Sequence, residues 1–204
     1  MNLDGKIAVV TGGAMGNGLG IVQVFLKLGA TVVILDRDDK LGETLHQLRQ
    51  TYSNVIGYKV DITDRDLVNR CVKAIIDKYG RIDILVNNAG VAKLVRFEEM
   101  TPEVRDFHID VNIKGTWNVT QAVYPYMVKQ KYGKIVNLSS VTGPKVADAG
   151  EVAYATTKAA IIGFTKGLAM EGVEHGINVN AILPGYIMTP MVEGIAKDTD
   201  ANKP

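Results

Sequence analysis

The stretch IAVVTGGAMGNG (7–18) decides the fold of this chain. A short run of β-branched and other apolar residues leads directly into a loop with glycines at 12, 16 and 18. Glycine lets a strand turn sharply into a helix and lets an anion approach the backbone, where the free N–H groups of the helix stabilise it. The spacing G-x-x-x-G-x-G differs from the common dinucleotide fingerprint G-x-G-x-x-G, although the physical logic is shared. The stretch therefore predicts a phosphate-binding turn, with a plain tight turn as the alternative.

Beyond this loop, short apolar runs alternate with longer segments of helical periodicity. The runs are IAVV (7–10), TVVIL (31–35), NVIGYKV (54–60), IDILVN (82–87), KIVNLS (134–139) and INVNAIL (177–183). Helices are expected near 18–28, 38–51, 64–79, 102–130 and 152–174. Continuous apolar runs predict strands that are covered on both faces. We therefore predict an α/β fold, a doubly wound parallel sheet of the Rossmann type in three αβα layers with about six strands, forming one domain over 1–204.

The composition excludes several classes of protein. Lys and Arg number 23 against 22 Asp and Glu, and this near-neutral balance argues against nucleic-acid or membrane-surface binding. No apolar run approaches the roughly 18 residues of a membrane span, and the start MNLDGK lacks a secretory signal. The single cysteine, Cys71, lies on the apolar stripe of its helix, so we expect a core residue in a reducing cytoplasm. The three histidines have no metal-ligand spacing, and no metal site is expected.

An acidic residue at the end of the second predicted strand bears on the choice of cofactor. Asp36 follows Gly16 by 36 − 16 = 20 residues. A carboxylate at this place accepts hydrogen bonds from the hydroxyls of an adenosine ribose and repels a 2′-phosphate. The pattern predicts NAD(H) rather than NADP(H). Arg37 is the opposing signal, because a guanidinium group binds phosphate, and a helix-capping role for Asp36 is the alternative.

Three polar residues near the fifth strand form a candidate catalytic group. Tyr154 and Lys158 are four residues apart on a predicted helix and therefore project from one face. A nearby ammonium group favours the phenolate and is expected to lower the pKa of Tyr154, which makes proton exchange with a substrate oxygen feasible. Ser140 ends the fifth strand, at the edge of the sheet where such folds bind ligands. Alone, the Tyr-x-x-x-Lys pair is a weak signal.

Seven motifs that occur in order along the chain strengthen the interpretation of Tyr154 and Lys158 as catalytic residues. They are TGGAMGNG (11–18), Asp61, NNAG (87–90), Asn112 within VNIKG, the serine pair 139–140, YATTK (154–158) and PGYIMT (184–189). Together they resemble the classical short-chain dehydrogenase/reductase family over nearly the whole chain. The stretches RDFHIDVNIKGTWNVT and SSVTGPKVADAGEVAYATTKAA are most similar to the UcpA-like bacterial oxidoreductases of that family.

The resemblance implies a role for each matching residue. Tyr154 would be the general acid/base, Ser140 would polarise the substrate oxygen, Lys158 would bind the nicotinamide ribose, and Asn112 would hold a proton-relay water. The cofactor-binding residues would be Gly12, Met15, Asn17, Gly18, Asp36, Arg37, Asp61, Ile62, Asn88, Ala89, Gly90, Tyr154, Lys158, Pro184, Gly185, Ile187 and Thr189. Two helices, the long one near 102–130 and the one bearing Tyr154, form the usual dimer face of the family, which implies a homo-oligomer, a dimer or tetramer.

Three departures from the family pattern qualify the resemblance. Asn17 stands where the family usually has a branched apolar residue. The separation of Ser140 and Tyr154 is 154 − 140 = 14, one longer than expected, which leaves Ser139 as an alternative serine. The chain also ends about 50 residues before the usual domain size, so we expect the seventh strand and much of the substrate lid to be missing and strand six to form a sheet edge.

The sequence leaves three functional hypotheses. The first is an NAD-dependent oxidoreductase that transfers a hydride between the cofactor and a small alcohol or ketone. Loss of activity through truncation of the chain is an alternative under this hypothesis. The second is an NAD-binding protein without turnover. The third is a 3-oxoacyl-thioester reductase, which would more naturally use NADPH and for which Lys93 and Arg96 are the only nearby basic residues.

Overall fold

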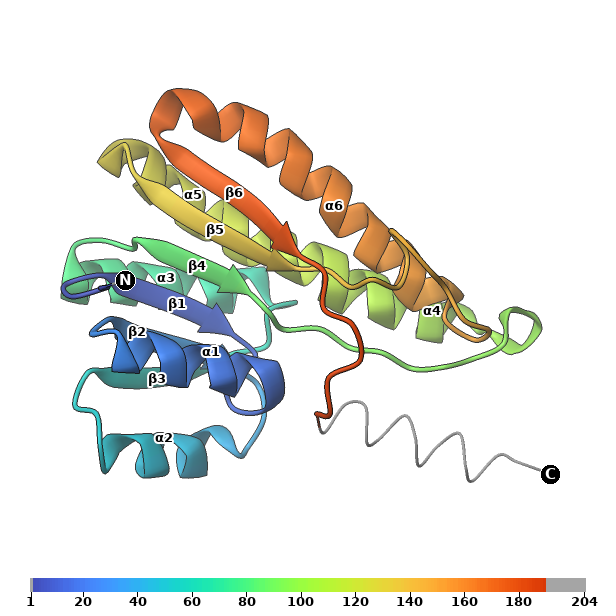
Figure 1. The fold of residues 1–204 in the computed structure, drawn as a ribbon, viewed down its shortest axis with the longest axis horizontal. Helices are drawn as coiled ribbons and strands as arrows, with labels where there is room; N and C mark the ends of the chain where they lie inside the picture. Colours follow the sequence, from blue (N-terminus) through green and yellow to red (C-terminus); the bar gives the residue numbers. More distant parts are fainter. Residues whose placement is uncertain (1, 190–204) are drawn as a thin grey trace.

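A six-stranded parallel sheet forms the centre of the computed structural model, which describes residues 2–189 (Figure 1). The strand order is β3-β2-β1-β4-β5-β6, the order of a doubly wound dinucleotide-binding sheet. The strands are β1 (Ile7–Thr11), β2 (Thr31–Asp36), β3 (Val55–Lys59), β4 (Ile84–Asn87), β5 (Gly133–Leu138) and β6 (Ile177–Ile182). The predicted fold class is confirmed, and in the described part of the chain β6 pairs only with β5.

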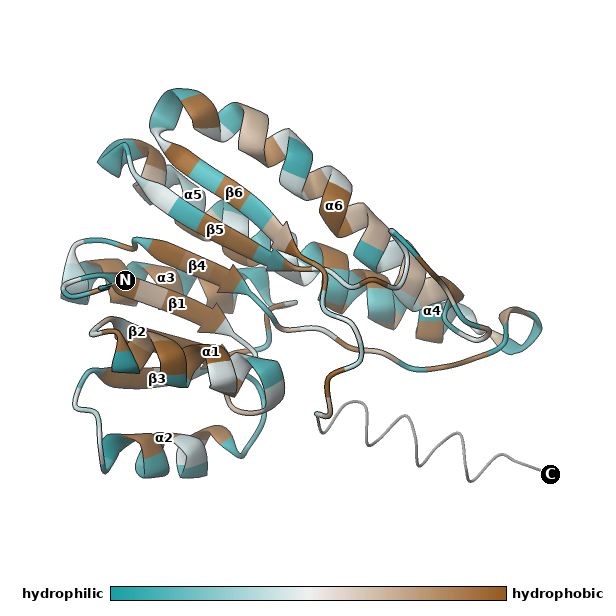
Figure 2. Ribbon diagram, viewed as in Figure 1, coloured by the Kyte–Doolittle hydropathy of each residue, from teal (hydrophilic) through white to brown (hydrophobic). Residues whose placement is uncertain are grey.

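Two layers of helices cover the sheet. On one face lie α1 (Gly16–Lys27) and α2 (Leu41–Arg49), whose apolar residues pack on β1, β2 and β3. On the other face lie α3 (Arg65–Tyr79), α5 (Thr116–Gln130) and α6 (Val152–Gly172). Figure 2 shows the resulting concentration of hydrophobic residues along the central strands. Cys71 lies in the second of these apolar layers, as expected.

The helix predicted over 102–130 is divided. It consists of α4 (Pro102–His108), a π-helical segment η2 (Ile109–Gly115) and α5 (Thr116–Gln130). Short 3₁₀ turns, η1 (Phe97–Glu99) and η3 (Val173–His175), precede α4 and follow α6. π-helical turns are rare and occur often at functional sites, and η2 contains Asn112.

The expectation that every strand is covered on both faces is wrong for part of the sheet. All residues of β1 and β4 are buried, whereas buried and partly exposed residues alternate along β5. In β6, Asn178, Asn180 and Ile182 are exposed. The alternation arises because α5 and α6 pack on one face of these strands, and no described helix covers the other.

Several helix ends have residues that suit their position. Thr101 caps α4 by accepting the Val104 amide, and Gly29 has a left-handed φ of 90° after α1. Asp64 caps α3 by accepting the Leu67 amide at 2.9 Å, and the neighbouring Thr63 hydroxyl donates to Asp61.

Candidate active site

A cleft of about 300 Å³ opens along the carboxyl ends of the strands. The chain moves outward from β1 to β3 and then returns to β4 on the other side of β1, so this edge contains the switch point where such folds bind ligands. The predicted residues that line the cleft are Gly12, Met15, Asn17, Asp36, Arg37, Asp61, Ile62, Asn88, Ala89, Gly90, Ser140, Tyr154, Lys158, Pro184, Gly185, Ile187 and Thr189. The structure thus brings together residues that are up to 177 positions apart in the sequence (189 − 12).

The glycine loop forms the floor of the cleft at the start of α1. Gly12 and Gly16 have left-handed φ values of 64° and 54°, and a Cβ atom on Gly12 would lie 2.9 Å from the Ala89 Cα. The helix begins after Met15, whose side chain caps no N–H group, and its first turn contains no acidic residue. The first N–H groups of α1 are therefore directed to the cleft without a side-chain acceptor, which fits the pyrophosphate of a dinucleotide.

Gly18 lies outside the cleft lining, although the family resemblance placed it along the cofactor phosphates. A Cβ atom there would lie 1.9 Å from the Gly12 carbonyl oxygen and 2.6 Å from Asn88 Nδ2. Gly18 allows α1 to approach the turn after β1. Its contribution to the site is therefore the close packing of the loop.

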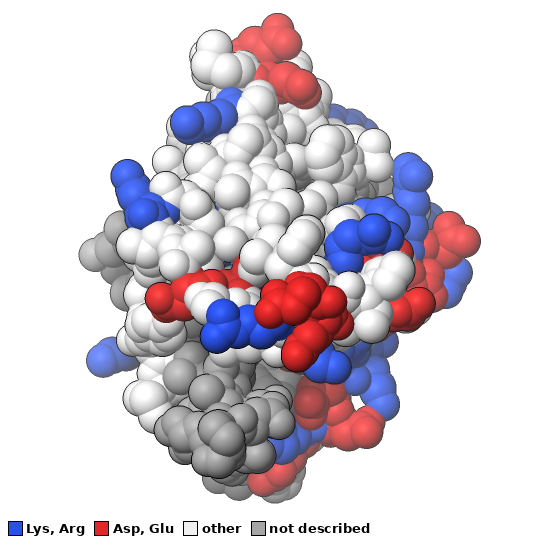
Figure 3. Space-filling model, turned by 90° about the vertical axis from the view of Figure 1, so that its right-hand side faces the viewer, with Lys and Arg blue, Asp and Glu red and all other residues white. Residues whose placement is uncertain are grey.

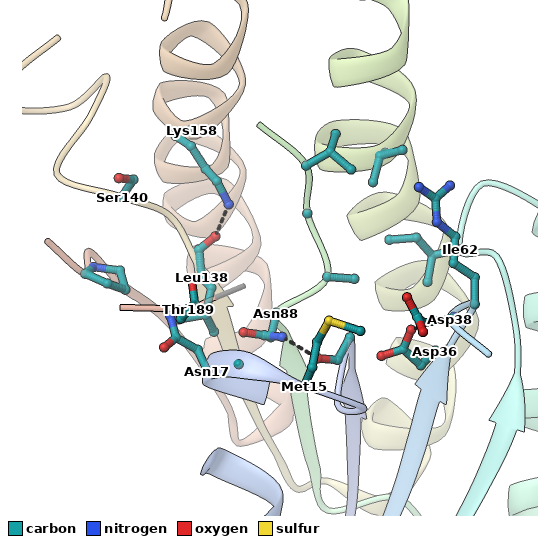
Figure 4. A pocket seen from close by; sticks show the side chains of 18 of the residues that line it. Met15, Asn17, Asp36, Asp38, Ile62, Asn88, Leu138, Ser140, Lys158 and Thr189 are labelled. Carbon is teal, nitrogen blue, oxygen red and sulfur yellow. Dashed lines mark hydrogen bonds between the residues drawn. The ribbon is translucent and has the colours of Figure 1, made fainter. Parts of the chain in front are cut away.

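Asn88 joins the loops after β1 and β4. Its Nδ2 donates to the carbonyl oxygens of Thr11 and Gly12 at 3.0 and 2.9 Å. In return, the Thr11 hydroxyl accepts the amides of Asn88 and Ala89. Figure 4 shows Asn88 between the Met15 side and the Lys158 side of the cleft. These bonds fix the middle of the cleft.

One end of the cleft is acidic. Asp36 accepts the Ala14 amide at 2.8 Å and the Asp38 amide at 2.9 Å, so its carboxylate holds both the glycine loop and the turn after β2. Asp38 lies beside it, as Figure 4 shows. Arg37 pairs with Asp61 at 3.1 Å. Burial acts to raise the pKa of Asp61, but hydrogen bonds from Thr63 and Arg37 bring it below its usual range.

The other end of the cleft carries Ser140, Tyr154 and Lys158. Ser140 follows β5, and its Oγ accepts the Thr142 amide at 3.1 Å. The Lys158 ammonium lies 5.6 Å from the centre of the Tyr154 ring and donates to the Leu138 carbonyl at 2.8 Å (Figure 4). Ser139 donates its hydroxyl to the Lys158 carbonyl at 2.7 Å. This bond commits Ser139 to joining β5 and α6, and Ser140 is the serine that lies beside the phenol.

The expected lowering of the Tyr154 pKa is not found. Burial raises the pKa of the Tyr154 phenol above its ordinary value of 10.0, hydrogen bonding with Ser140 acts against this, and the charge of Glu151 adds to it. Burial also lowers the pKa of the Lys158 ammonium to about 8. The sequence interpretation considered the attraction between the two groups but not the desolvation that each undergoes.

Asn112 also lies outside the cleft lining. Its side chain is buried and makes two hydrogen bonds with one residue: Oδ1 accepts the Val91 amide at 2.8 Å, and Nδ2 donates to the Val91 carbonyl at 2.9 Å. A third bond joins Nδ2 to the Thr157 hydroxyl. Both Nδ2 hydrogens are therefore in hydrogen bonds, and the side chain holds Val91, which itself lines the cleft.

Several lining residues were missed from the sequence. They are Leu35, Asp38, Val60, Val91, Val111 and Leu138, whereas Gly16 was expected in the phosphate-binding turn and Ser139 was the alternative serine. Asp38 had a usable signal, because it lies two residues after Asp36 at the end of β2. The apolar lining residues had no such signal, since nothing in the local sequence distinguishes an apolar residue of a cleft wall from one of the core.

Neither a metal site nor a membrane helix is found within residues 2–189. No group of three His, Cys, Asp or Glu side chains there could hold a metal ion. No helix in that range combines the length and the apolar character that crossing a bilayer requires.

Comparison with known proteins places the chain in a family. The family model of the short chain dehydrogenases matches residues 6–200. The chain therefore belongs to the short-chain dehydrogenase family, whose members are oxidoreductases that use a nicotinamide dinucleotide. Oxidoreductase UcpA of Salmonella typhimurium is 50% identical over 202 residues, which cover 99% of this chain and 77% of that protein. The predicted similarity to the UcpA-like oxidoreductases is confirmed.

Two further relatives bear on the chemistry. The 3-oxoacyl-[acyl-carrier-protein] reductase FabG of Thermotoga maritima is 43% identical over 194 residues, which cover 95% of this chain and 78% of that protein. The solved structure of ElxO with NADP bound is 35% identical, with a TM-score of 0.87, and the match covers 96% of this chain and 78% of ElxO.

Proposed function

We propose that this chain transfers a hydride between NAD(H) and a small alcohol or ketone, with Tyr154 as the acid/base group. The observation that carries the proposal is the convergence of Ser140, Tyr154 and Lys158 at one end of a cleft whose other end is acidic. An extended dinucleotide that binds along the glycine loop has its adenosine at Asp36 and its nicotinamide near Tyr154.

The protein groups supply the proton and the orientation, while the bound dinucleotide supplies or accepts the hydride. A phenol whose pKa is raised above 10 is protonated at neutral pH. Tyr154 is therefore poised to donate a proton to a carbonyl oxygen, and the Ser140 hydroxyl donates a second hydrogen bond to the same oxygen. Ketone reduction is the direction that this protonation state favours. Alcohol oxidation requires the phenolate, so its rate should increase with pH.

The preference for NAD(H) is supported by the charges at the adenosine end. Asp36, Asp38 and Asp61 line this end, and Arg37 is already paired with Asp61. A 2′-phosphate would meet a net negative charge there. We expect NADH to bind at least about 10-fold more tightly than NADPH, as measured by quenching of protein fluorescence. Equal affinities would contradict this assignment.

The activity is tested with NADH and a panel of ketones, and with NAD and a panel of polyols and sugars. The absorbance of the reduced nicotinamide reports turnover. Tyr154→Phe preserves the ring and removes the proton donor, so it should lower kcat by about 10²–10⁴-fold while NADH affinity is retained. Binding of NADH without turnover in the wild type would instead favour the hypothesis of a cofactor-binding protein.

Reduction of a 3-oxoacyl thioester is the second candidate, and the similarity to FabG supports it. Acetoacetyl-CoA with NADPH, compared with 2,3-butanedione and NADH, separates the two. The acidic adenosine end argues against the NADPH reaction. A higher kcat/KM with acetoacetyl-CoA would replace the first proposal by the second.

We also propose that the chain forms a homo-oligomer through α5 and α6, as the family resemblance implies. Trp117 of α5 is 51% exposed and packs against Phe164 of α6, with ring centres 4.9 Å apart. Met170 and Val152 of α6 are also exposed. Figure 3 shows one face of the molecule with a largely uncharged middle and acidic side chains at its upper end. Sedimentation velocity should give at least a dimer, and a monomer at micromolar concentration would contradict this.

A further inference from the structure

The segment from Val91 to Val95 has no helical or strand structure of its own, and its first residue, Val91, lines the cleft. It leaves the end of β4 and passes α4 (Figure 1). Three different partners hold alternate amides of this segment. Asn112 Oδ1 accepts the Val91 amide at 2.8 Å, His108 Nε2 accepts the Lys93 amide at 3.0 Å, and the Gly150 carbonyl accepts the Val95 amide at 3.0 Å.

His108 is completely buried and lies outside the cleft lining. Its Nδ1 lies 2.8 Å from the Val104 carbonyl oxygen, which can only accept a hydrogen bond. Nδ1 therefore carries the proton, and the lone pair of Nε2 is free to accept the Lys93 amide. Both ring nitrogens are satisfied in this tautomer, so the ring orientation is fixed by two backbone groups.

His108 and Asn112 hold alternate residues of the same segment. His108 ends α4, and Asn112 lies about one turn further along, in the π-helical segment η2. Alternate residues of an extended chain are separated by about 6.6 Å. Two side chains one helical turn apart can therefore bind Val91 and Lys93 at the same time, as the hydrogen bonds here show.

The far end of the segment is tied to the loop that leads into the catalytic helix. Val95 binds Gly150, and the next residue, Glu151, immediately precedes α6, which presents Tyr154 in its first turn. A displacement of Lys93 would therefore loosen the chain between Val91, which lines the cleft, and Val95, which is bound to the loop before Tyr154. The glycine loop and the Asp36 turn are held by separate hydrogen bonds and would stay in place.

We propose that His108 is a positioning residue for substrate: through the Lys93 amide it fixes the segment Val91–Val95, which runs from the cleft lining to its hydrogen bond with the loop before α6, without touching substrate or cofactor. This inference deepens the proposed function and rests on it for its kinetic consequence.

A pair of variants with the same chemistry tests the proposal. In His108→Gln the amide oxygen reaches the place of Nε2 and still accepts from Lys93. In His108→Asn the shorter side chain can donate to the Val104 carbonyl but cannot reach Lys93. His46→Asn, on the exposed side of α2, is the control for loss of a histidine.

The first measurement is amide hydrogen exchange of the whole chain, which requires no turnover. In His108→Asn, exchange at Lys93 should be at least about 10-fold faster, while exchange at Val91 stays slow because Asn112 still holds it. His108→Gln and His46→Asn should retain the wild-type exchange at Lys93. Unchanged exchange in His108→Asn, or equal effects of Asn and Gln, would overturn the proposal.

The second measurement is steady-state kinetics with NADH and 2,3-butanedione. His108→Asn should raise KM for the ketone by about 10-fold, with kcat and the NADH dissociation constant changed less than about twofold, and His108→Gln should restore KM. A loss of NADH affinity as large as the change in KM would indicate a general structural role instead and overturn the proposal. If the wild type has no turnover, the proposed function fails, and the exchange experiment alone decides the role of His108 in holding the segment.

Discussion

Burial of the Lys158 ammonium should make folding stability depend on pH in a defined range. The side chain is 6% exposed, and the pKa of its ammonium is lowered from 10.5 to about 8. In the unfolded chain the group is hydrated and has its ordinary value. A difference of roughly 2.5 pKa units corresponds to about 3 kcal/mol, at 1.36 kcal/mol per unit.

Proton binding by the folded and unfolded chains determines whether stability rises or falls with pH. Between pH 8 and pH 10.5, the unfolded chain holds the Lys158 proton and the folded chain does not. The free energy of unfolding contributed by this group therefore increases as pH rises from 8 to 10.5, and this gain is lost again as pH falls from 10.5 to 8. Below pH 8 the folded protein keeps a buried charge at the cost of about 3 kcal/mol.

Lys158→Met removes the charge and keeps an unbranched side chain of similar volume. Urea unfolding, followed by the fluorescence of Trp117, the only tryptophan, gives the free energy of unfolding of both proteins from pH 7 to pH 10.5. The wild type should gain about 3 kcal/mol relative to the variant over this range. At pH 7 the variant should be at least as stable as the wild type. Leaving the Leu138 carbonyl without its donor costs about 1–3 kcal/mol, and removal of the buried charge offsets this cost.

Lys166→Met is the matched control, since Lys166 is an exposed lysine of the same helix. Its stability relative to the wild type should stay constant over this range, because an exposed ammonium keeps its hydration when the chain unfolds. If the difference in the free energy of unfolding between the wild type and Lys158→Met also stays constant with pH to within about 0.5 kcal/mol, the Lys158 ammonium is not desolvated and the reasoning is refuted.

Two further substitutions test the packing and the chemistry of the cleft. Gly18→Ala should destabilise the protein by about 2–3 kcal/mol in urea, because its Cβ would lie 1.9 Å from the Gly12 carbonyl oxygen, whereas Gly20→Ala, which meets nothing within 4 Å, should stabilise it by about 0.5–1 kcal/mol. Equal effects would contradict the assigned packing. Ser140→Ala should lower kcat by about 10²–10³-fold and raise the pKa of Tyr154 further, since hydrogen bonding with Ser140 lowers it. Ultraviolet titration of tyrosinate, with Tyr154→Phe as reference, would show an unchanged pKa if the two groups do not interact.

The positions of the strands were predictable because their signal is local. The expected strand 177–183 is observed as Ile177–Ile182, and 134–139 as Gly133–Leu138. Apolar runs of this length, separated by helical segments, have few other arrangements than a parallel sheet. The predicted helix 102–130 differs, because the π-helical turn at Ile109–Gly115 has no signature that the apolar periodicity could show.

The sequence by itself determined the order of the elements, the glycine loop, and the places of Asp36, Ser140 and Tyr154 at one edge of the sheet. Turn chemistry and hydrophobic period act over a few residues, so a linear pattern is enough to locate them. Only the tertiary structure decided the protonation of the site and the support of its wall. The pKa directions of Tyr154 and Lys158 depend on how much water the fold excludes. The hydrogen bond from Lys93 to His108 joins the segment after β4 to the end of α4, two parts of the chain that meet only in the folded protein.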